Sequence, residues 1–198
     1  DSIGLISTQV HGIMENGYIY GVNGAGMIAR GYGGSVGLFG YSYQNGGVQN
    51  VYVLMDSWYQ TGTSAALLSR SEISKKTLSN IYTVGDFYTV GAAEGKNYLL
   101  PLTTLQAVNN NSKASGVQNV WCLTSREYAN KSVVHTGEIA RLYDKEWQKS
   151  ILGSAFDVDG CVSMGFYPRL YLPTEMQKYQ EYIPLPVMGQ DAAPKLVG

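Results

Sequence analysis

Two aspartates have the residue type and spacing for acid–base chemistry. Asp56 and Asp86 each follow by six residues an asparagine of a recurring phrase. Two carboxylates on one edge of neighbouring strands would give the arrangement that glycoside hydrolysis uses. The alternative is that both aspartates cap turns at strand ends, because the third copy of the phrase has Ser125 at this offset. Turn capping is the favoured interpretation.

Metal-ligating residues are scarce. The chain has two histidines, His11 and His135, and two cysteines, Cys122 and Cys161. The stretch HGIME pairs His11 with Glu15 but lacks the second histidine of the zinc-binding HExxH motif. The glycine run GVNGAG is not followed by the Lys–Ser or Lys–Thr of a phosphate-binding loop. We therefore expect no metal, no cofactor and no catalytic residue, and we expect free buried thiols in preference to a disulfide.

One seven-residue phrase occurs three times. Its asparagine recurs as Asn50, Asn80 and Asn119. In stacked parallel strands these side chains would form a ladder, each amide bonding to the asparagines on either side, and we favour this structural role over a binding role. The copies are VQNVYVL (48–54), LSNIYTV (78–84) and VQNVWCL (117–123).

The phrase also aligns three large aromatic residues. Tyr52, Tyr82 and Trp121 occupy its fifth position. In stacked strands their rings would form a stripe with a spacing of about 4.8 Å. The stripe is either covered by a loop or by the C-terminal segment, or exposed to a protein or glycan partner.

Two further aromatic residues are the first candidates for binding. Trp58 and Tyr59 lie in DSWYQTG (56–62), which we expect to be a turn. Burial is less assured in a turn than in a strand. The predicted binding residues are therefore Trp58 and Tyr59, followed by the stripe residues Tyr52, Tyr82 and Trp121.

A second short element alternates with the phrase. Each copy has small residues before large apolar ones, and Gly, Asn or Ser clusters separate the copies. Such alternation predicts an all-β fold, a right-handed parallel β-helix or solenoid. The copies are AGMIAR (25–30), VGLFGY (36–41), SAALLSR (64–70) and NYLLPL (97–102).

After residue 124 the pattern stops and helical spacing begins. Leu142, Trp147 and Ile151 fall on one helical face. A short helix is expected at 174–183, with Thr174 as its N-cap and Met176, Tyr179 and Ile183 on one side. We predict coils over 1–124, a small mixed cap with the last coil over 125–186, and a linker over 187–198.

The composition limits the possible partners. Charged residues are 15% of the chain and the net charge is −1, which predicts binding to neither nucleic acid nor an anionic membrane. No apolar run approaches the roughly 20 residues of a membrane span. The 24 glycines and 16 tyrosines are typical of an extracellular β-rich protein. The pattern is already under way at Asp1, so we expect a segment, monomeric by itself, of a larger chain.

The repeats resemble a known family. AGMIAR, VGLFGYSYQNGGVQNVYVLMD and SAALLSRS…LSNIYTVGDF are similar to GLUG-type β-helix repeats of Gram-positive surface proteins. The closing FDVDGCVSMGFYPRLYLPTEMQKYQEYIPLP resembles the YPRL-x-LP segment that ends such repeats. The likeness, over roughly residues 12–186, is to the non-catalytic region of immunoglobulin A-cleaving zinc metalloproteases. It implies a β-helix module of a secreted or surface-attached bacterial protein that acts on host glycoproteins. The protease activity is not implied, because the HExxH site has no counterpart.

Three functions remain open after this comparison. The leading hypothesis is a non-enzymatic adhesin-like module that binds a host glycoprotein, with immunoglobulin the partner that the resemblance suggests. The second is a structural stalk that positions a protease. The third is a carbohydrate-active enzyme that uses Asp56 and Asp86.

Overall fold

The computed structural model describes residues 2–7, 13–21, 26–29, 35–39, 47–61, 64–65, 78–90, 117–124 and 135–187. Its strands are β1 (Ser2–Ser7), β2 (Ile13–Tyr20), β3 (Gly26–Ala29), β4 (Ser35–Phe39), β5 (Gly47–Thr61), β6 (Ser64–Ala65), β7 (Leu78–Val90), β8 (Val117–Leu123), β9 (His135–Gly137), β10 (Phe156–Asp157) and β11 (Arg169–Leu170). Its helices are η2 (Ile139–Tyr143), α2 (Lys145–Leu152), η3 (Gly153–Ala155), α3 (Val158–Ser163) and α4 (Thr174–Gln177), where η denotes a 3₁₀ helix.

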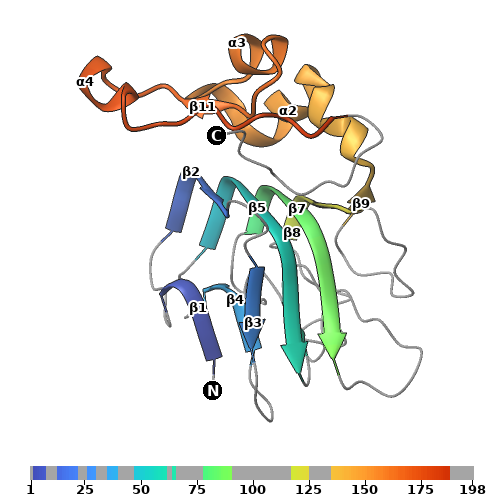
Figure 1. Cartoon of the computed structure of the whole chain (residues 1–198). Helices are drawn as coiled ribbons and strands as arrows, with labels where there is room; N and C mark the ends of the chain where they lie inside the picture. Colours follow the sequence, from blue (N-terminus) through green and yellow to red (C-terminus); the bar gives the residue numbers. More distant parts are fainter. Residues whose placement is uncertain are drawn as a thin grey trace.

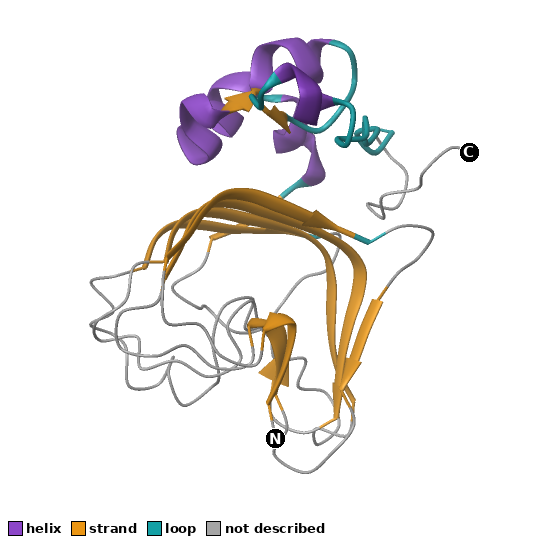
Figure 2. Ribbon diagram, turned by 90° about the vertical axis from the view of Figure 1, so that its left-hand side faces the viewer, coloured by secondary structure: helices purple, strands orange, loops and turns teal. Residues whose placement is uncertain are grey.

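The strands form three sheets. The largest has six parallel strands in the order β2-β5-β7-β8-β9, with β3 also paired to β5. A second parallel sheet has the order β1-β4-β6, and β10 and β11 form an antiparallel pair. The long strands β5 and β7 turn a corner in Figure 2. The register between them shifts between Leu54 and Ser57, and an irregularity of this kind bends a strand.

The repeated asparagines sit at kinks inside the strands. Asn50, Asn80 and Asn119 have φ angles of 52° to 58°, a left-handed conformation that asparagine tolerates better than most residues. The Asn80 amide donates to Asn50 Oδ1 at 3.1 Å, and the Asn119 amide donates to Asn80 Oδ1 at 3.1 Å. The predicted parallel pairing of the three phrases and their asparagine ladder are confirmed.

The ladder has a fourth member that the sequence analysis missed. Asn16 also has a positive φ angle, 53°, and its Oδ1 accepts from Asn50 Nδ2 at 3.0 Å. Strand β2 pairs in register with β5 through Gly17 opposite Val51 and Tyr18 opposite Tyr52. MENGYIY (14–20) is thus a further copy of the phrase, in which Gly17 replaces the usual β-branched residue.

Helices cover one face of the large sheet, as Figures 1 and 2 show. Helix α2 begins where the Asp144 side chain accepts from the Trp147 amide at 3.0 Å, and it ends at Gly153 with φ 67°. Trp147 and Ile151 of α2 are buried, as their predicted common helical face requires. Leu142 is also buried, but it lies in η2, on the other side of the extended residue Asp144.

Strand alternation separates the two faces of the sheet. Tyr52 and Tyr82 belong to the apolar cluster that the helices complete. Val51 and Ile81 lie one residue earlier, are also fully buried, and alternate to the opposite face. The large sheet is therefore buried on both faces around Val51–Tyr52 and Ile81–Tyr82. Burial on both faces explains why these strands carry a nearly uninterrupted run of apolar residues.

The prediction of an all-β right-handed parallel β-helix is wrong. Within the described residues, parallel strands combine with a layer of helices and a small antiparallel pair, and these residues do not trace closed coils. The 125–186 segment was expected to cap the end of a stack, but its helices lie along the face that carries the tyrosines. The physical reason is that this face needs an apolar cover with hydrogen-bond acceptors, which repeat spacing does not reveal.

Candidate binding surface

The aromatic stripe exists and is longer than expected. Tyr52 and Tyr82 stack with ring centroids 5.3 Å apart and an interplanar angle of 5°. Tyr18 continues the stripe, its centroid 5.0 Å from that of Tyr52. Trp121 lies opposite Tyr82 in the register. The aligned aromatic position predicted from the phrase is confirmed.

The centre of the stripe is covered. Tyr52 and Tyr82 are 0% exposed. Tyr52 Oη donates to the carbonyl of Pro168 at 2.7 Å, and Tyr82 Oη donates to Gln148 Oε1 at 2.9 Å. Of the two possibilities that the sequence left open, the structure has the covered one, and these rings belong to the core and not to an accessible surface.

Burial also sets the protonation of these side chains. It raises the pKa of Tyr52 and of Tyr82 well above the ordinary value, and it raises the pKa of Tyr167, which packs 5.8 Å from Tyr52. A buried phenolate would lose its hydration, so the neutral form is strongly favoured. Tyr52, Tyr82 and Tyr167, hereafter the buried tyrosines, therefore remain neutral in the folded protein at physiological pH.

The last stripe residue, Trp121, lies at the edge of the helical layer. The Arg141 guanidinium carbon is 4.4 Å from its ring centroid, and the His135 ring stacks at 4.7 Å. Trp147 meets it edge-on at 5.7 Å. Trp121 is half-buried and its Nε1 donates to Asn119 Oδ1 at 3.0 Å. Arg141, His135 and Trp147 therefore pack against much of the Trp121 ring.

Trp58 and Tyr59 lie in a strand and not in the predicted turn. Strand β5 continues through them, with Trp58 in register with Met27 and Phe87. The phrase ended at Leu54, and nothing in its pattern indicated that the strand would run to Thr61. The side chains of Trp58 and Tyr59 lie outside the described part of the structure, so their role in binding stays a prediction.

The two aspartates do not align as the hydrolase hypothesis requires. Asp86 pairs with Ser57, while Asp56 lies in the stretch of β5 where the register shifts. The equal six-residue offsets did not account for this bulge. Among residues with described side chains, no group of three His, Cys, Asp or Glu could hold a metal ion. Cys122 and Cys161 are both buried and are not joined in a disulfide, as predicted.

The largest exposed aromatic side chains described lie in residues 169–182, which we name the arm. The arm comprises β11, α4 and the following turns. In Figure 1, α4 is drawn above and to the left of β2. Tyr179 is 75% exposed and Tyr171 63%, while Met176 and Tyr182 are each 48% exposed. These apolar surfaces face solvent.

The arm is held in shape by side-chain amides. Gln180 Nε2 donates to the carbonyl of Leu170 at 2.8 Å, and Gln180 Oε1 accepts from the Leu170 amide at 2.9 Å. Gln177 Oε1 accepts from Arg169 Nη2 at 2.7 Å. The Arg169 guanidinium lies 4.1 Å above the Tyr182 ring centroid. The exposed rings therefore project from an ordered support.

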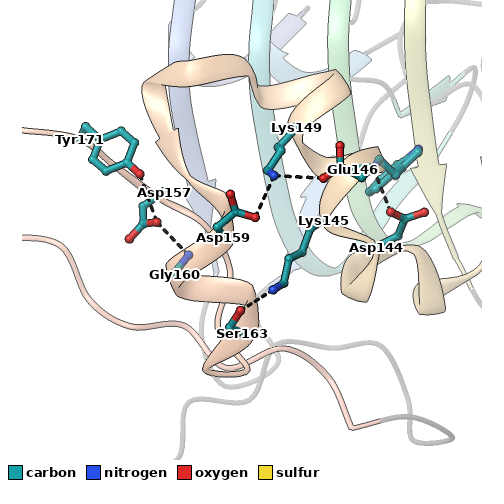
Figure 3. A network of polar contacts seen from close by, with 10 residues as sticks. Asp144, Lys145, Glu146, Lys149, Asp157, Asp159, Gly160, Ser163 and Tyr171 are labelled. Atoms are coloured by element: carbon teal, nitrogen blue, oxygen red, sulfur yellow. Dashed lines mark hydrogen bonds and ion pairs between the residues drawn. The ribbon is translucent and has the colours of Figure 1, made fainter.

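A polar network ties the base of the arm to the helices, as Figure 3 shows. Asp157 caps α3 by accepting from the Gly160 amide at 2.9 Å, and it also accepts from Tyr171 Oη at 3.2 Å. Lys149 of α2 bonds Asp159 of α3 at 2.8 Å. Lys145 of α2 also donates to Ser163 Oγ of α3 at 2.5 Å. Together these contacts join α2, α3 and the base of the arm.

The arm also rests on the first strand of the sheet. Tyr18 Oη donates to Gln180 Oε1 at 3.2 Å, and Tyr20 Oη donates to Glu181 Oε2 at 2.9 Å. Desolvation, followed by this bond to Glu181, raises the pKa of Tyr20 to about 12. The arm and β2 are therefore fixed relative to each other.

The exposure of the arm could not be predicted from helical spacing. The predicted helix at 174–183 put Met176, Tyr179 and Ile183 on one side. Helix α4 ends at Gln177, and its N-cap is Pro173 instead of Thr174. Ile183 is buried at 2% exposure, but Tyr179 lies beyond the helix and faces solvent.

No described helix is long and apolar enough to cross a membrane. No protein-family profile, curated protein or solved structure matches this chain.

Proposed function

We propose that the chain is a non-enzymatic protein-binding module and that the arm is its recognition surface. The observation that carries the proposal is the group of exposed aromatic residues on an ordered support. Tyrosine, methionine and arginine are enriched at the centres of protein interfaces. A ring that is already held in place loses little conformational entropy on binding.

The partner in this proposal is an extracellular host glycoprotein. The composition and the repeat resemblance support a secreted or surface-attached bacterial protein. Immunoglobulin, which the resemblance suggests, is the first partner to test. The stalk and carbohydrate-enzyme hypotheses have less support, because neither explains why large rings are exposed on the arm.

Capture from serum tests the proposal. The immobilised chain is expected to retain a defined serum glycoprotein, identified by mass spectrometry and then titrated in purified form. Replacing Tyr179 with alanine should weaken that binding by about 2 kcal/mol, or roughly thirty-fold. Tyr179 lies 75% exposed, so its removal should leave the melting temperature nearly unchanged.

Two controls separate the ring from other effects. Tyr179→Phe keeps the ring and should retain most of the affinity. Val187→Ala removes an apolar surface of similar exposure, 62%, outside the arm and should bind as the parent chain does. Equal affinity of Tyr179→Ala and the parent chain for the captured glycoprotein would refute the arm as its binding surface. Retention of no serum protein would refute the proposed function.

A further inference from the structure

The outer edge of β2 is open within the described part of the chain. Strand β2 is the first in the six-stranded order and pairs there only with β5. Val51 and Tyr52 of β5 are fully buried, whereas Gly17 and Tyr18, opposite them in β2, are partly exposed. Ile13 is 58% exposed. An uncovered edge of this kind presents peptide groups to which another strand can bond.

The hydrogen bonds of the asparagine ladder all run in one direction, towards the outer edge of β2. Each amide Nδ2 donates to the Oδ1 of the asparagine one strand earlier. Asn16 accepts from Asn50 in this way, but its own Nδ2 has no hydrogen-bond partner among the described residues. Its φ angle of 53° already matches that of the other members. Asn16 therefore has the backbone conformation that a further asparagine–asparagine hydrogen bond from its Nδ2 requires.

The opposite end of the ladder is closed. Asn119 Oδ1 accepts from Trp121 Nε1 at 3.0 Å, and Asn119 Nδ2 also donates to the carbonyl of Ser150 at 3.2 Å. Strand β9 pairs with the outer side of β8. One end of the same ladder is thus bonded to other groups of the protein, whereas the Asn16 donor at the other end has no partner among the described residues.

The aromatic stripe is open at the same end. Tyr18 stacks on Tyr52 and its hydroxyl is fixed by Gln180, which sets the orientation of the ring. Tyr18 is only partly buried, whereas Tyr52 and Tyr82 are 0% exposed. Backbone edge, amide donor and aromatic ring therefore lie together on one strand.

We propose that the outer edge of β2 binds an extended strand of a partner polypeptide, in parallel and in register with the phrase. The partner strand carries an apolar residue, a polar residue, Asn, any residue and an aromatic residue in that order. Its asparagine Oδ1 accepts from Asn16 Nδ2, and its aromatic ring stacks on Tyr18. Strand addition to an open sheet edge is an established mode of peptide recognition. This site goes beyond the arm and would stand if the arm bound nothing.

A second copy of this chain does not fit the edge. The Asn119 end of a second copy cannot accept from Asn16 Nδ2. Asn119 Oδ1 already accepts from Trp121, and Asn119 Nδ2 already donates to the carbonyl of Ser150. Two copies joined through β2 by a two-fold axis perpendicular to the sheet would pair antiparallel, which does not continue a parallel ladder. The occupant must therefore be a different polypeptide segment with the phrase exposed.

Titration with synthetic peptides tests this inference. The probe is GVQNVYVL, the sequence of residues 47–54, flanked by lysines for solubility. Matched peptides replace its asparagine by alanine, reverse the order of its residues, or methylate its backbone nitrogens. The decisive variant of the chain is Asn16→Asp, which keeps an acceptor oxygen for Asn50 and replaces the outward donor with a charged carboxylate oxygen. Its melting temperature verifies that the fold is retained.

The expected result is binding of the probe that weakens at least ten-fold in Asn16→Asp, as the loss of one buried hydrogen bond with its desolvation implies. The alanine, reversed and methylated peptides should also bind at least ten-fold more weakly, and Tyr179→Ala should bind the probe normally. Absence of probe binding, equal binding by Asn16→Asp, or equal binding of the reversed peptide overturns the proposal. Dimerisation of the chain alone through β2, seen by sedimentation and abolished by Asn16→Asp, overturns it in favour of a second copy.

Discussion

Removal of one buried hydroxyl group should reveal how the helical layer holds the sheet. Tyr82 Oη donates to Gln148 Oε1 at 2.9 Å, and both side chains are 0% exposed. Tyr82→Phe keeps the ring in its stack but leaves the Gln148 oxygen buried without a donor. A net hydrogen bond contributes about 1 kcal/mol and a stranded buried acceptor costs about 1–3 kcal/mol. We expect a loss of about 2 kcal/mol in the free energy of unfolding, or about 4–8 °C in melting temperature.

A double-mutant cycle isolates this interaction. Gln148→Met removes the acceptor, and also the bond from Gln148 Nε2 to the carbonyl of Leu142. Tyr82→Phe should cost about 1 kcal/mol less in the Gln148→Met background, because no acceptor is then stranded. Urea unfolding followed by tryptophan fluorescence is the assay, since Trp147 lies 5.4 Å from Tyr82. Tyr182→Phe, at a ring 48% exposed, is the control and should change stability by less than about 0.5 kcal/mol. A similarly small effect of Tyr82→Phe, or no coupling to Gln148, would refute the reasoning.

Three further predictions concern the ladder, the buried tyrosines and a helix cap. Asn80→Ala loses two amide hydrogen bonds and puts alanine in a left-handed conformation, so the free energy of unfolding in urea should fall by about 3 kcal/mol. Asn80→Gly, which tolerates that conformation, should lose about 1 kcal/mol less. Folding raises the pKa of each buried tyrosine, so their contribution to stability is fully present below the unfolded pKa near 10. As pH rises above that value, the free energy of unfolding should fall by about 4 kcal/mol per pH unit for the three together. Denaturant titrations from about pH 9 to about pH 11 should show this decline above the unfolded pKa, and flat stability there would contradict the burial. Gly160→Ala would place a Cβ 2.5 Å from Asp157 Oδ2, so thermal melting should show a loss of about 1–2 kcal/mol, against less than about 0.5 kcal/mol for the exposed Ser163→Ala.

The sequence predicted features that repeat and missed those that depend on unique contacts. Asn50, Asn80 and Asn119 could be aligned because a shared position in parallel strands imposes a shared neighbour. The copy at Asn16 was hidden because Gly17 broke the β-branched pattern. The aromatic position was predicted, but its burial stayed one of two alternatives, since the cover depends on Gln148 reaching Tyr82 from a distant segment.

The overall architecture and the arm illustrate the same limit. Short repeated strands favour a solenoid when only their mutual spacing is considered. The helical layer overturned that fold, although the spacing of Trp147 and Ile151 had correctly indicated a helix with one apolar face. Leu142, assigned to the same face, lies in the separate helix η2. At the arm, spacing extended a helix to residue 183, but α4 ends at Gln177, where side-chain amides of Gln177 and Gln180 bond the Leu170 and Leu172 carbonyls. Tyr179, predicted on the same helical side as Ile183, therefore faces solvent while Ile183 is buried.

Tyrosine footprinting with and without the captured serum glycoprotein tests the central claim most directly. The claim is that the arm recognises the partner while the centre of the stripe belongs to the core. Oxidative labelling read by mass spectrometry should modify Tyr179 in the free chain and spare Tyr52 and Tyr82, which are 0% exposed. The bound glycoprotein should protect Tyr179 from modification. Modification of Tyr52 or Tyr82 in the free chain with protection on binding, together with unchanged labelling of Tyr179, would contradict the account.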